Sequence, residues 1–151
     1  MNIGDFQKLL VKGKTILGLD IGSKTIGVAV SDAGLMIASP LKTIFRTSFN
    51  NDMAELKGFI ASRNVCALVA GLPLEMSGKE GERATITRGI GDRIAEAVGL
   101  PIFYWDERFS SVAVERIMIE QADLSRKKRK KAIDRSAAAY ILQGFLDALP
   151  K

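Results

Sequence analysis

The chain has 151 residues, of which 47% are hydrophobic and 26% charged, and its 22 Lys and Arg against 17 Asp and Glu give a formal net charge of +5. This length and composition are typical of one globular domain that buries a core without disulfides or structural metals. There is no His and one Cys, which excludes Ser-His-Asp triads, Cys-His nucleophiles and Cys/His zinc sites. Any catalysis must use carboxylates, hydroxyls, Lys, Arg or a bound metal.

The composition also predicts where the protein works. The single Cys66 lies in an apolar run, as expected for a small core residue in a reducing cytosol. No apolar run approaches the ~20 residues of a membrane span. Asp5, Gln7 and Lys8 interrupt the N-terminus where a signal peptide would be apolar. We therefore expect a cytoplasmic protein with no membrane partner.

The first part of the chain predicts an N-terminal extension over residues 1–14, followed by a single domain over 15–151. Two β-rich runs, 15–19 and 26–30, flank a turn-like segment and predict an antiparallel hairpin. A third extended stretch around 34–45 contains Pro40, which is typical of an edge strand. These three strands would form an antiparallel meander.

The second part alternates helices and strands. The expected helices are 50–64, 80–98, about 110–121 and about 134–148, and the expected strands are 65–70 and 100–105. In the second helix, Ile86, Ile90, Ile94 and Val98 lie on one stripe, and Gly99 would end it. The pattern predicts an α/β fold with a mixed five-stranded sheet, its last strands helix-linked and parallel, and helices on both faces.

Six consecutive basic residues account for the whole net charge, since subtracting their +6 from +5 leaves −1 for all other residues. They are Arg126, Lys127, Lys128, Arg129, Lys130 and Lys131. Such a run repels itself and attracts polyanions, which predicts a mobile loop that binds nucleic-acid phosphates. A solvated loop without a partner is the alternative.

Carboxylates follow two of the predicted strands and begin the last helix. Asp20 follows the apolar run 17–19, Asp106 and Glu107 follow 101–105, and Asp134 opens the final helical pattern. If the two strands are near neighbours and the last helix crosses them, three carboxylates converge at one edge of the sheet. Mutually repelling carboxylates suit a hard cation such as Mg²⁺ or Mn²⁺, and two such ions can hydrolyse a phosphodiester without a histidine base.

Each carboxylate also has a structural interpretation. Asp134 could cap the last helix, Asp106 could pair with Arg108 or start a turn, and Asp20 could form an Asx-turn. Because side chains alternate along a strand, Asp106 and Glu107 should lie on opposite faces, and only one should point into the site. The sequence leaves that choice open.

Four segments in register closely resemble the YqgF/RuvX family. They are GLDIGSKTIGVAVSD at 18–32, VAGLPL at 69–74, DERFSS at 106–111 and IDRSAAA at 133–139. Members of this family are Holliday-junction-resolvase-like proteins or pre-16S rRNA nucleases with an RNase H-like fold. The match extends over about 15–149, so residues 1–14 lie outside it.

The resemblance implies roles for individual residues. Asp20 would be the metal ligand of the first strand, the motif at 106–108 would supply the second carboxylate, and Asp134 would be the ligand from the last helix. Asp106 is narrowly favoured over Glu107. Lys24 and Arg108 are candidates for binding the scissile phosphate, with ordinary surface charge as the alternative.

The resulting hypothesis is a metal-dependent endonuclease that hydrolyses phosphodiester bonds in structured nucleic acid. The substrate would be the 5′ end of a 16S rRNA precursor or a Holliday junction, with ribosomal particles as a further partner and a monomer or homodimer as the active form. One alternative is a non-catalytic RNA- or ribosome-binding module. Another is an ATPase of the actin/sugar-kinase class, which the length disfavours because those enzymes need two such domains.

Overall fold

The computed structural model describes residues 1–107 and 126–150, except for the side chains of residues 126–136. Its centre is a five-stranded sheet with the order β3-β2-β1-β4-β5. The strands are β1 (Thr15–Ile21), β2 (Thr25–Ser31), β3 (Ala38–Phe45), β4 (Val65–Leu72) and β5 (Ile102–Asp106). β1, β2 and β3 pair antiparallel, whereas β1, β4 and β5 pair parallel. The predicted α/β fold, with a mixed five-stranded sheet made of an antiparallel meander followed by parallel strands, is confirmed.

The order of the sheet explains the burial of its strands. β1 and β4 are central, and β4 is buried along its whole length, as expected for a strand covered on both faces. β3, with Pro40, is an edge strand, as predicted. β1 continues two residues beyond the predicted run, so Asp20 lies inside the strand, one residue before its end.

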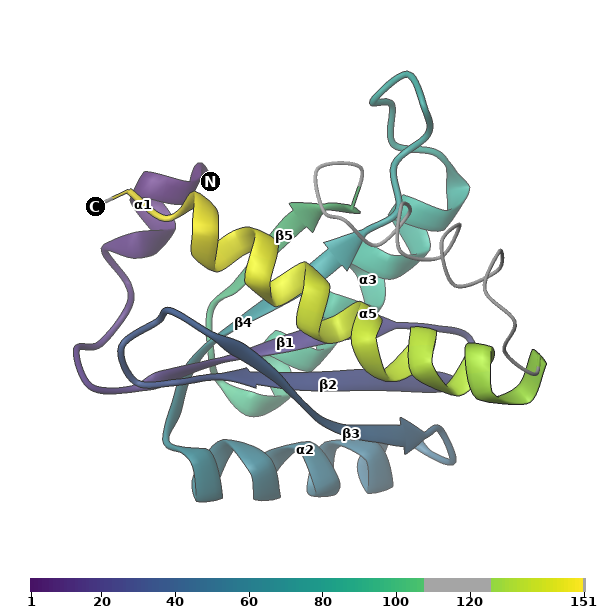
Figure 1. Cartoon of the computed structure of the whole chain (residues 1–151), viewed down its shortest axis with the longest axis horizontal. Helices are drawn as coiled ribbons and strands as arrows, with labels where there is room; N and C mark the ends of the chain where they lie inside the picture. The colour runs from purple at the N-terminus through teal and green to yellow at the C-terminus, as the bar shows by residue number, and fades with distance from the viewer. Residues whose placement is uncertain (108–125, 151) are drawn as a thin grey trace.

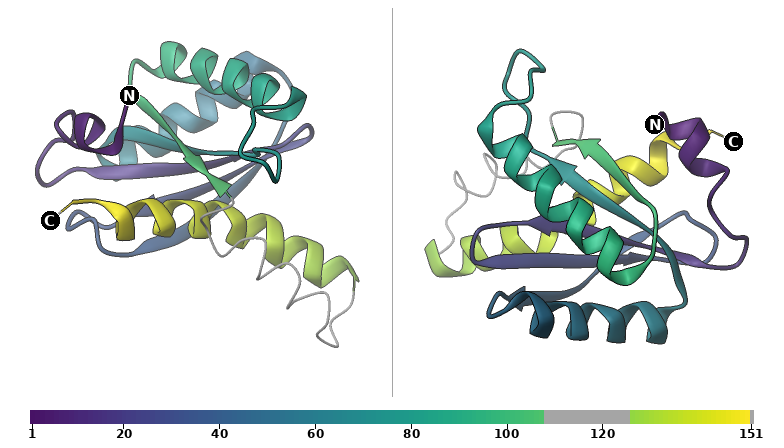
Figure 2. Two further views of the ribbon diagram at one scale, coloured as in Figure 1. Left: turned by 90° about the horizontal axis from the view of Figure 1, so that it is seen from above. Right: turned by 180° about the vertical axis from the view of Figure 1, so that it is seen from behind.

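Helices cover both faces of the sheet, as Figures 1 and 2 show. The long helix α5 (Arg126–Ala148) crosses one face and contacts β1, β2, β3 and β4. Helices α2 (Phe49–Arg63) and α3 (Glu82–Val98) lie on the opposite face. The short helix α1 (Ile3–Gln7) places Phe6 against Phe145 of α5, so the N-terminal extension contributes to the core.

Two apolar clusters fill these layers. The cluster on the α5 side includes Ile16, Val69, Ile141, Leu142 and Phe145. The cluster on the side of α2 and α3 includes Leu17, Leu19, Leu56, Leu68 and Ile94. Neighbouring residues of β1 therefore alternate between the two clusters, as the two-residue period of a strand requires.

The final helix begins earlier than predicted. The basic run 126–131 forms the first residues of α5 instead of a loop, and Asp134 is internal to the helix instead of its first residue. Both predictions were wrong because Lys and Arg have high helix propensity, and the 100° step between helical residues spreads consecutive charges around the axis. In Figure 1, this end of α5 extends past the sheet beyond the β1–β2 turn.

Three residues of the stripe predicted for helix α3, Ile90, Ile94 and Val98, pack against the core, and the fourth does not. The buried residues of the helix are Ala84, Thr87, Gly91 and Ile94, whereas Ile86 is 54% exposed. Residues spaced strictly four apart drift around a helix of 3.6 residues per turn, so the first residue of the predicted stripe lies off the buried face. Gly99 ends the helix with a positive φ of 70°, as predicted. The helix predicted at about 110–121 lies outside the described residues.

Candidate active site at the carboxyl ends of the parallel strands

The carboxyl ends of β1, β4 and β5 lie at the same edge of the sheet because these strands are parallel. The register pairs Leu19 with Ala70 and Gly71 with Trp105. Asp20 is therefore level with Gly71, one strand away. The last residues of β1 and β5 are separated only by β4, as the convergence hypothesis requires.

The two faces of β5 are identified by the contacts of its aromatic side chains. Trp105 packs edge-on against Phe145 of α5, with ring centroids 6.4 Å apart. The hydroxyl of Tyr104 points the other way and donates to Asp92 Oδ1 of α3 at 2.6 Å. Burial and this hydrogen bond raise the pKa of Tyr104 above its usual value. Strand alternation then places Asp106 on the α3 side, with Tyr104.

Glu107 lies on the opposite side, next to α5. A Cβ atom at Gly71 would lie 2.6 Å from Glu107 Oε1 and 2.5 Å from Ile141 Cδ1 of α5. The missing side chain at Gly71 thus leaves room for the Glu107 carboxylate above β4.

Asp20 shares this side of the sheet. Gly18, two residues earlier on the same face of β1, lies under α5, because its Cβ would be 2.8 Å from Leu142 Cβ. The structure therefore brings Asp20 and Glu107 to one face at one edge and separates Asp106 from them. The geometry favours Glu107 over Asp106 as the neighbour of Asp20, although the sequence narrowly favoured Asp106.

Asp134 approaches this edge through the backbone of α5. The carbonyl oxygen of Ala138 would lie 3.1 Å from a Cβ atom at Gly18, which fixes where the helix crosses β1. Asp134 precedes Ala138 by about one helical turn, roughly 6 Å along the axis. The N-terminal end of α5 points toward the carboxyl end of β1, so Asp134 lies on the Asp20 side of that crossing (Figure 1).

The turn after Asp20 is held by an arginine that the sequence did not single out. Arg46, just after β3, donates from Nη1 to Gly22 O at 2.7 Å and to Ser23 O at 3.3 Å. Its backbone N–H donates to Lys24 O at 2.9 Å. Lys24 is exposed in this turn, as predicted. The contact of Arg46 depends on the pairing of β2 with β3, so no local pattern could have indicated it.

The remaining predicted residues are only partly described. Arg108 lies outside the described residues, and residues 126–131 are placed by their backbone in α5. Within the side chains that the structure describes, which do not include that of Asp134, no group of three metal-ligating residues is found. In the same part of the chain, no helix combines the length and apolar character needed to cross a membrane.

Comparison of the sequence with known proteins assigns the chain to a family. Residues 14–148 match the RuvX family model, described as a Holliday junction resolvase. A relative from Cereibacter sphaeroides, named "Putative pre-16S rRNA nuclease", is 50% identical over 148 residues, which cover 98% of this chain and 92% of the relative. One of the same name from Sphingopyxis alaskensis is 50% identical, with 97% and 95% covered.

Among solved structures, Thermus thermophilus RuvC in complex with a Holliday junction substrate aligns with a TM-score of 0.48 and 13% identity, covering 88% of this chain and 94% of that one. The family assignment rests on the family model and the sequence relatives, which extend over nearly the whole chain. The chain belongs to the RuvX family.

Proposed function

We propose that this protein is a divalent-metal-dependent nuclease that hydrolyses phosphodiester bonds in structured nucleic acid. The observation that carries the proposal is the placement of Asp20 and Glu107 on the same α5 face of the sheet, at the carboxyl ends of parallel strands. The family description and the names of the relatives both belong to nucleases, which supports a nuclease over an ATPase.

The residues at this edge suit a hard cation. The side chains are carboxylates, the ligands that Mg²⁺ and Mn²⁺ prefer, and Gly71 leaves space beside one of them. Asp20 and Glu107 would hold the metal, with Asp134 of α5 as the third ligand. When bound, the metal would lower the pKa of a water molecule and stabilise the charge that develops at phosphorus.

The chain's own cations would bind and orient the substrate. Lys24 lies in the turn that follows Asp20, and Arg46 holds that turn through the carbonyls of Gly22 and Ser23. Lys24 and Arg108 would bind the phosphate that is cleaved. The basic residues 126–131, on the part of α5 that extends past the sheet, would bind flanking phosphates.

The candidate substrates are the 5′ end of a 16S rRNA precursor and a four-way DNA junction. The first agrees with the names of the relatives and with action in the cytoplasm, on or near ribosomal particles, and a monomer could perform it. The second agrees with the family description and would call for a homodimer, because paired cuts in a two-fold junction need two sites. Comparing cleavage of both substrates and measuring the solution mass would distinguish them.

Asp20→Asn tests the proposal. We expect loss of Mg²⁺- or Mn²⁺-dependent cleavage of both substrates. The temperature of thermal unfolding and the affinity for nucleic acid should match those of the wild type. Asp5→Asn, which removes the same charge from the exposed surface of α1, is the matched control and should cleave normally. Equal cleavage by Asp20→Asn and the wild type would overturn the metal site. Metal-independent binding without cleavage by the wild type would instead support the non-catalytic binding module.

A further inference from the structure

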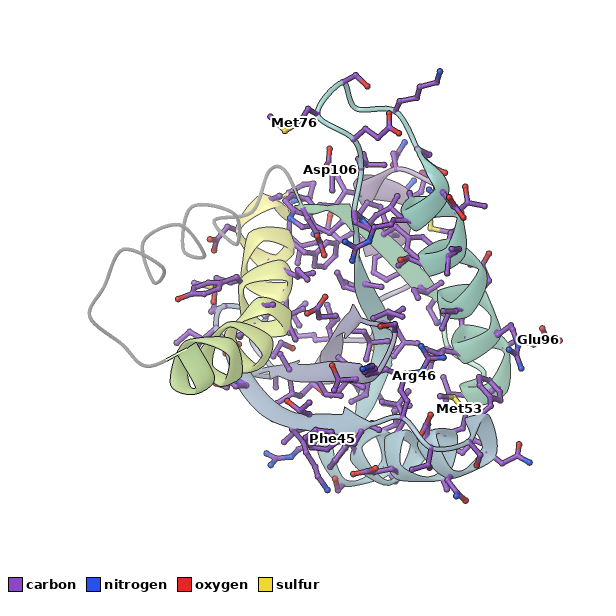
Figure 3. The ribbon with its side chains drawn as sticks, turned by 90° about the vertical axis from the view of Figure 1, so that its right-hand side faces the viewer. Phe45, Arg46, Met53, Met76, Glu96 and Asp106 are labelled. Carbon is purple, nitrogen blue, oxygen red and sulfur yellow. The ribbon has the colours of Figure 1, made fainter. Side chains whose placement is uncertain are left out.

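A cavity of about 100 Å³ lies between the start of α2, the end of β3 and α3. Arg46, Thr47, Ser48, Phe49, Asp52 and Arg93 contribute to its lining. Figure 3 looks directly at this edge of the molecule, with Arg46 close to the start of α2. A space of this size holds several water molecules or one tetrahedral oxyanion.

Two guanidinium groups line the cavity with donors to spare. Arg46 uses Nη1 for the carbonyls of the β1–β2 turn, and its Nε and Nη2 make no hydrogen bond within the described part of the chain. Arg93 stacks over the ring of Phe49, 4.3 Å from its centroid, and there too has neither a hydrogen bond nor an ion pair. Because a guanidinium carries five N–H donors, both groups can bind an oxyanion while keeping these interactions.

The rest of the lining is compatible with an anion. The cavity lies at the N-terminus of the 15-residue helix α2, capped by Ser48, whose Oγ accepts from Asn51 N. The positive end of the helix dipole adds to the two arginines. Asp52 is 5% exposed and is the opposing charge, so the lining has a formal charge of +1. Its Oδ1 accepts the N–H of Thr47 at 3.2 Å.

The cavity is linked to the candidate active site through the turn after β1. Arg46 bonds the carbonyls of Gly22 and Ser23, two and three residues after Asp20. Asp20 and Glu107 lie on the α5 face, whereas the cavity lies between α2 and α3 on the opposite face. A nucleic-acid strand bound at Asp20 would reach the cavity by passing around the β1–β2 turn, which carries Lys24.

We infer that this cavity is a second phosphate site, in which Arg46 and Arg93 bind a backbone phosphate that flanks the one cleaved. The inference rests on the proposed function in that it takes nucleic acid as the substrate. It adds a site on the other face of the sheet, and the residues of this site are distinct from the catalytic carboxylates. The substrate is thereby held on both sides of the β1–β2 turn.

The test measures binding in EDTA, so that it does not depend on cleavage. The probes are a four-way DNA junction and an RNA stem with a single-stranded 5′ extension, each bound to the full chain and followed by fluorescence anisotropy. Arg93→Gln is the main variant because Arg93 makes no polar contact within the described residues. Arg63→Gln, at the far end of α2, removes the same charge and is the matched control.

We expect Arg93→Gln to weaken binding of the better-bound probe several-fold and to reduce the slope of log K against log salt by about 0.7–0.9, the value for one phosphate contact. Arg63→Gln should change neither quantity, and Arg93→Lys should restore most of the slope. Equal effects of Arg93→Gln and Arg63→Gln would mean that only net charge matters, and would overturn the site.

A phosphate scan gives the position of the contact. Each phosphate of the probe is replaced in turn by an uncharged methylphosphonate, and each replacement is tested with the wild type and with Arg93→Gln. One replacement should weaken binding by the wild type and have no further effect on binding by Arg93→Gln. This is expected because removing both partners of a single contact costs no more than removing one of them. Additive losses at every position would contradict the inference. Cleavage by Asp20→Asn would refute the proposed metal site but leave this binding result interpretable.

Discussion

The carboxylate of Glu107 occupies the space that a side chain at Gly71 would fill, since a Cβ atom there would lie 2.6 Å from Glu107 Oε1. The same Cβ would lie 2.5 Å from Ile141 Cδ1, so α5 also depends on this glycine. Gly71 is level with Asp20 on the neighbouring strand. One missing side chain thus permits both the packing of α5 and the approach of two carboxylates.

Gly71→Ala should therefore damage stability and activity together. Because the methyl group would meet both Ile141 and Glu107, we expect a loss of about 1–3 kcal/mol in the free energy of unfolding. Cleavage should fall because Glu107 is displaced. Urea denaturation measures the first effect. Gly58→Ala in α2, where a Cβ would meet nothing within 4 Å, is the control and should stabilise the protein by up to about 1 kcal/mol.

Glu107→Gln and Asp106→Asn should differ sharply, although each removes one charge from neighbouring residues. Glu107 shares the α5 face with Asp20, whereas strand alternation puts Asp106 on the α3 face. We expect Glu107→Gln to lower kcat/KM on the order of 100-fold, the scale for losing one group that stabilises transition-state charge. Asp106→Asn should stay within a few-fold of the wild type. The reverse ranking would restore Asp106 as the ligand.

Neutralising the basic start of α5 should weaken nucleic-acid binding without affecting metal binding. In a variant with Lys127, Lys128, Lys130 and Lys131 all replaced by Gln, the slope of log K against log salt should become shallower by about 0.7–0.9 for each phosphate that the variant no longer neutralises. For any remaining cleavage, the metal concentration that gives half-maximal activity should be the same as for the wild type. An unchanged salt slope would show that this end of the helix binds no phosphate.

The β2–β3 loop should respond to acid through Asp32. Its Oδ1 accepts the N–H groups of Ile37 at 2.9 Å and Met36 at 2.8 Å, and these bonds lower the pKa of Asp32 below its usual 3.8. The stabilisation that these hydrogen bonds give to the folded loop is therefore fully present above pH 3.8. It is lost as the pH falls through the lower pKa that Asp32 has in the folded protein. The amide signals of Met36 and Ile37 should titrate in that range. Asp32→Asn should abolish the titration.

The elements that could be predicted from sequence are those with strong local patterns. The hairpin of β1 and β2, the buried run of β4 and the glycine that ends α3 follow from β-branched residues and backbone preference. The start of α5 could not be predicted from charge repulsion within 126–131, because the helix propensity of Lys and Arg outweighs it. The predicted stripe of α3 was right for Ile90, Ile94 and Val98 and wrong for Ile86, which fits the spacing but not the buried face.

For the candidate site as well, part could be predicted from the sequence and part could not. Its chemistry was predictable, because a chain without His leaves carboxylates and a hard cation as the simplest means of hydrolysing a phosphodiester. The contact of Arg46 with the carbonyls of Gly22 and Ser23 was not predictable, because Arg46 follows these residues by 24 and 23 positions in the sequence. Neither was the cavity that Arg46 shares with Arg93 of α3.

By itself, the sequence determined which groups are present: carboxylates near the ends of two strands, six adjacent cations, and no imidazole. It also determined the strands and most of the helices, because these depend on neighbouring residues. Only the tertiary structure decided which groups meet. Strand register and the packing of α5 on Gly18 and Gly71 put Glu107, rather than Asp106, on the face of Asp20. That choice depends on contacts between distant segments, which no local spacing specifies.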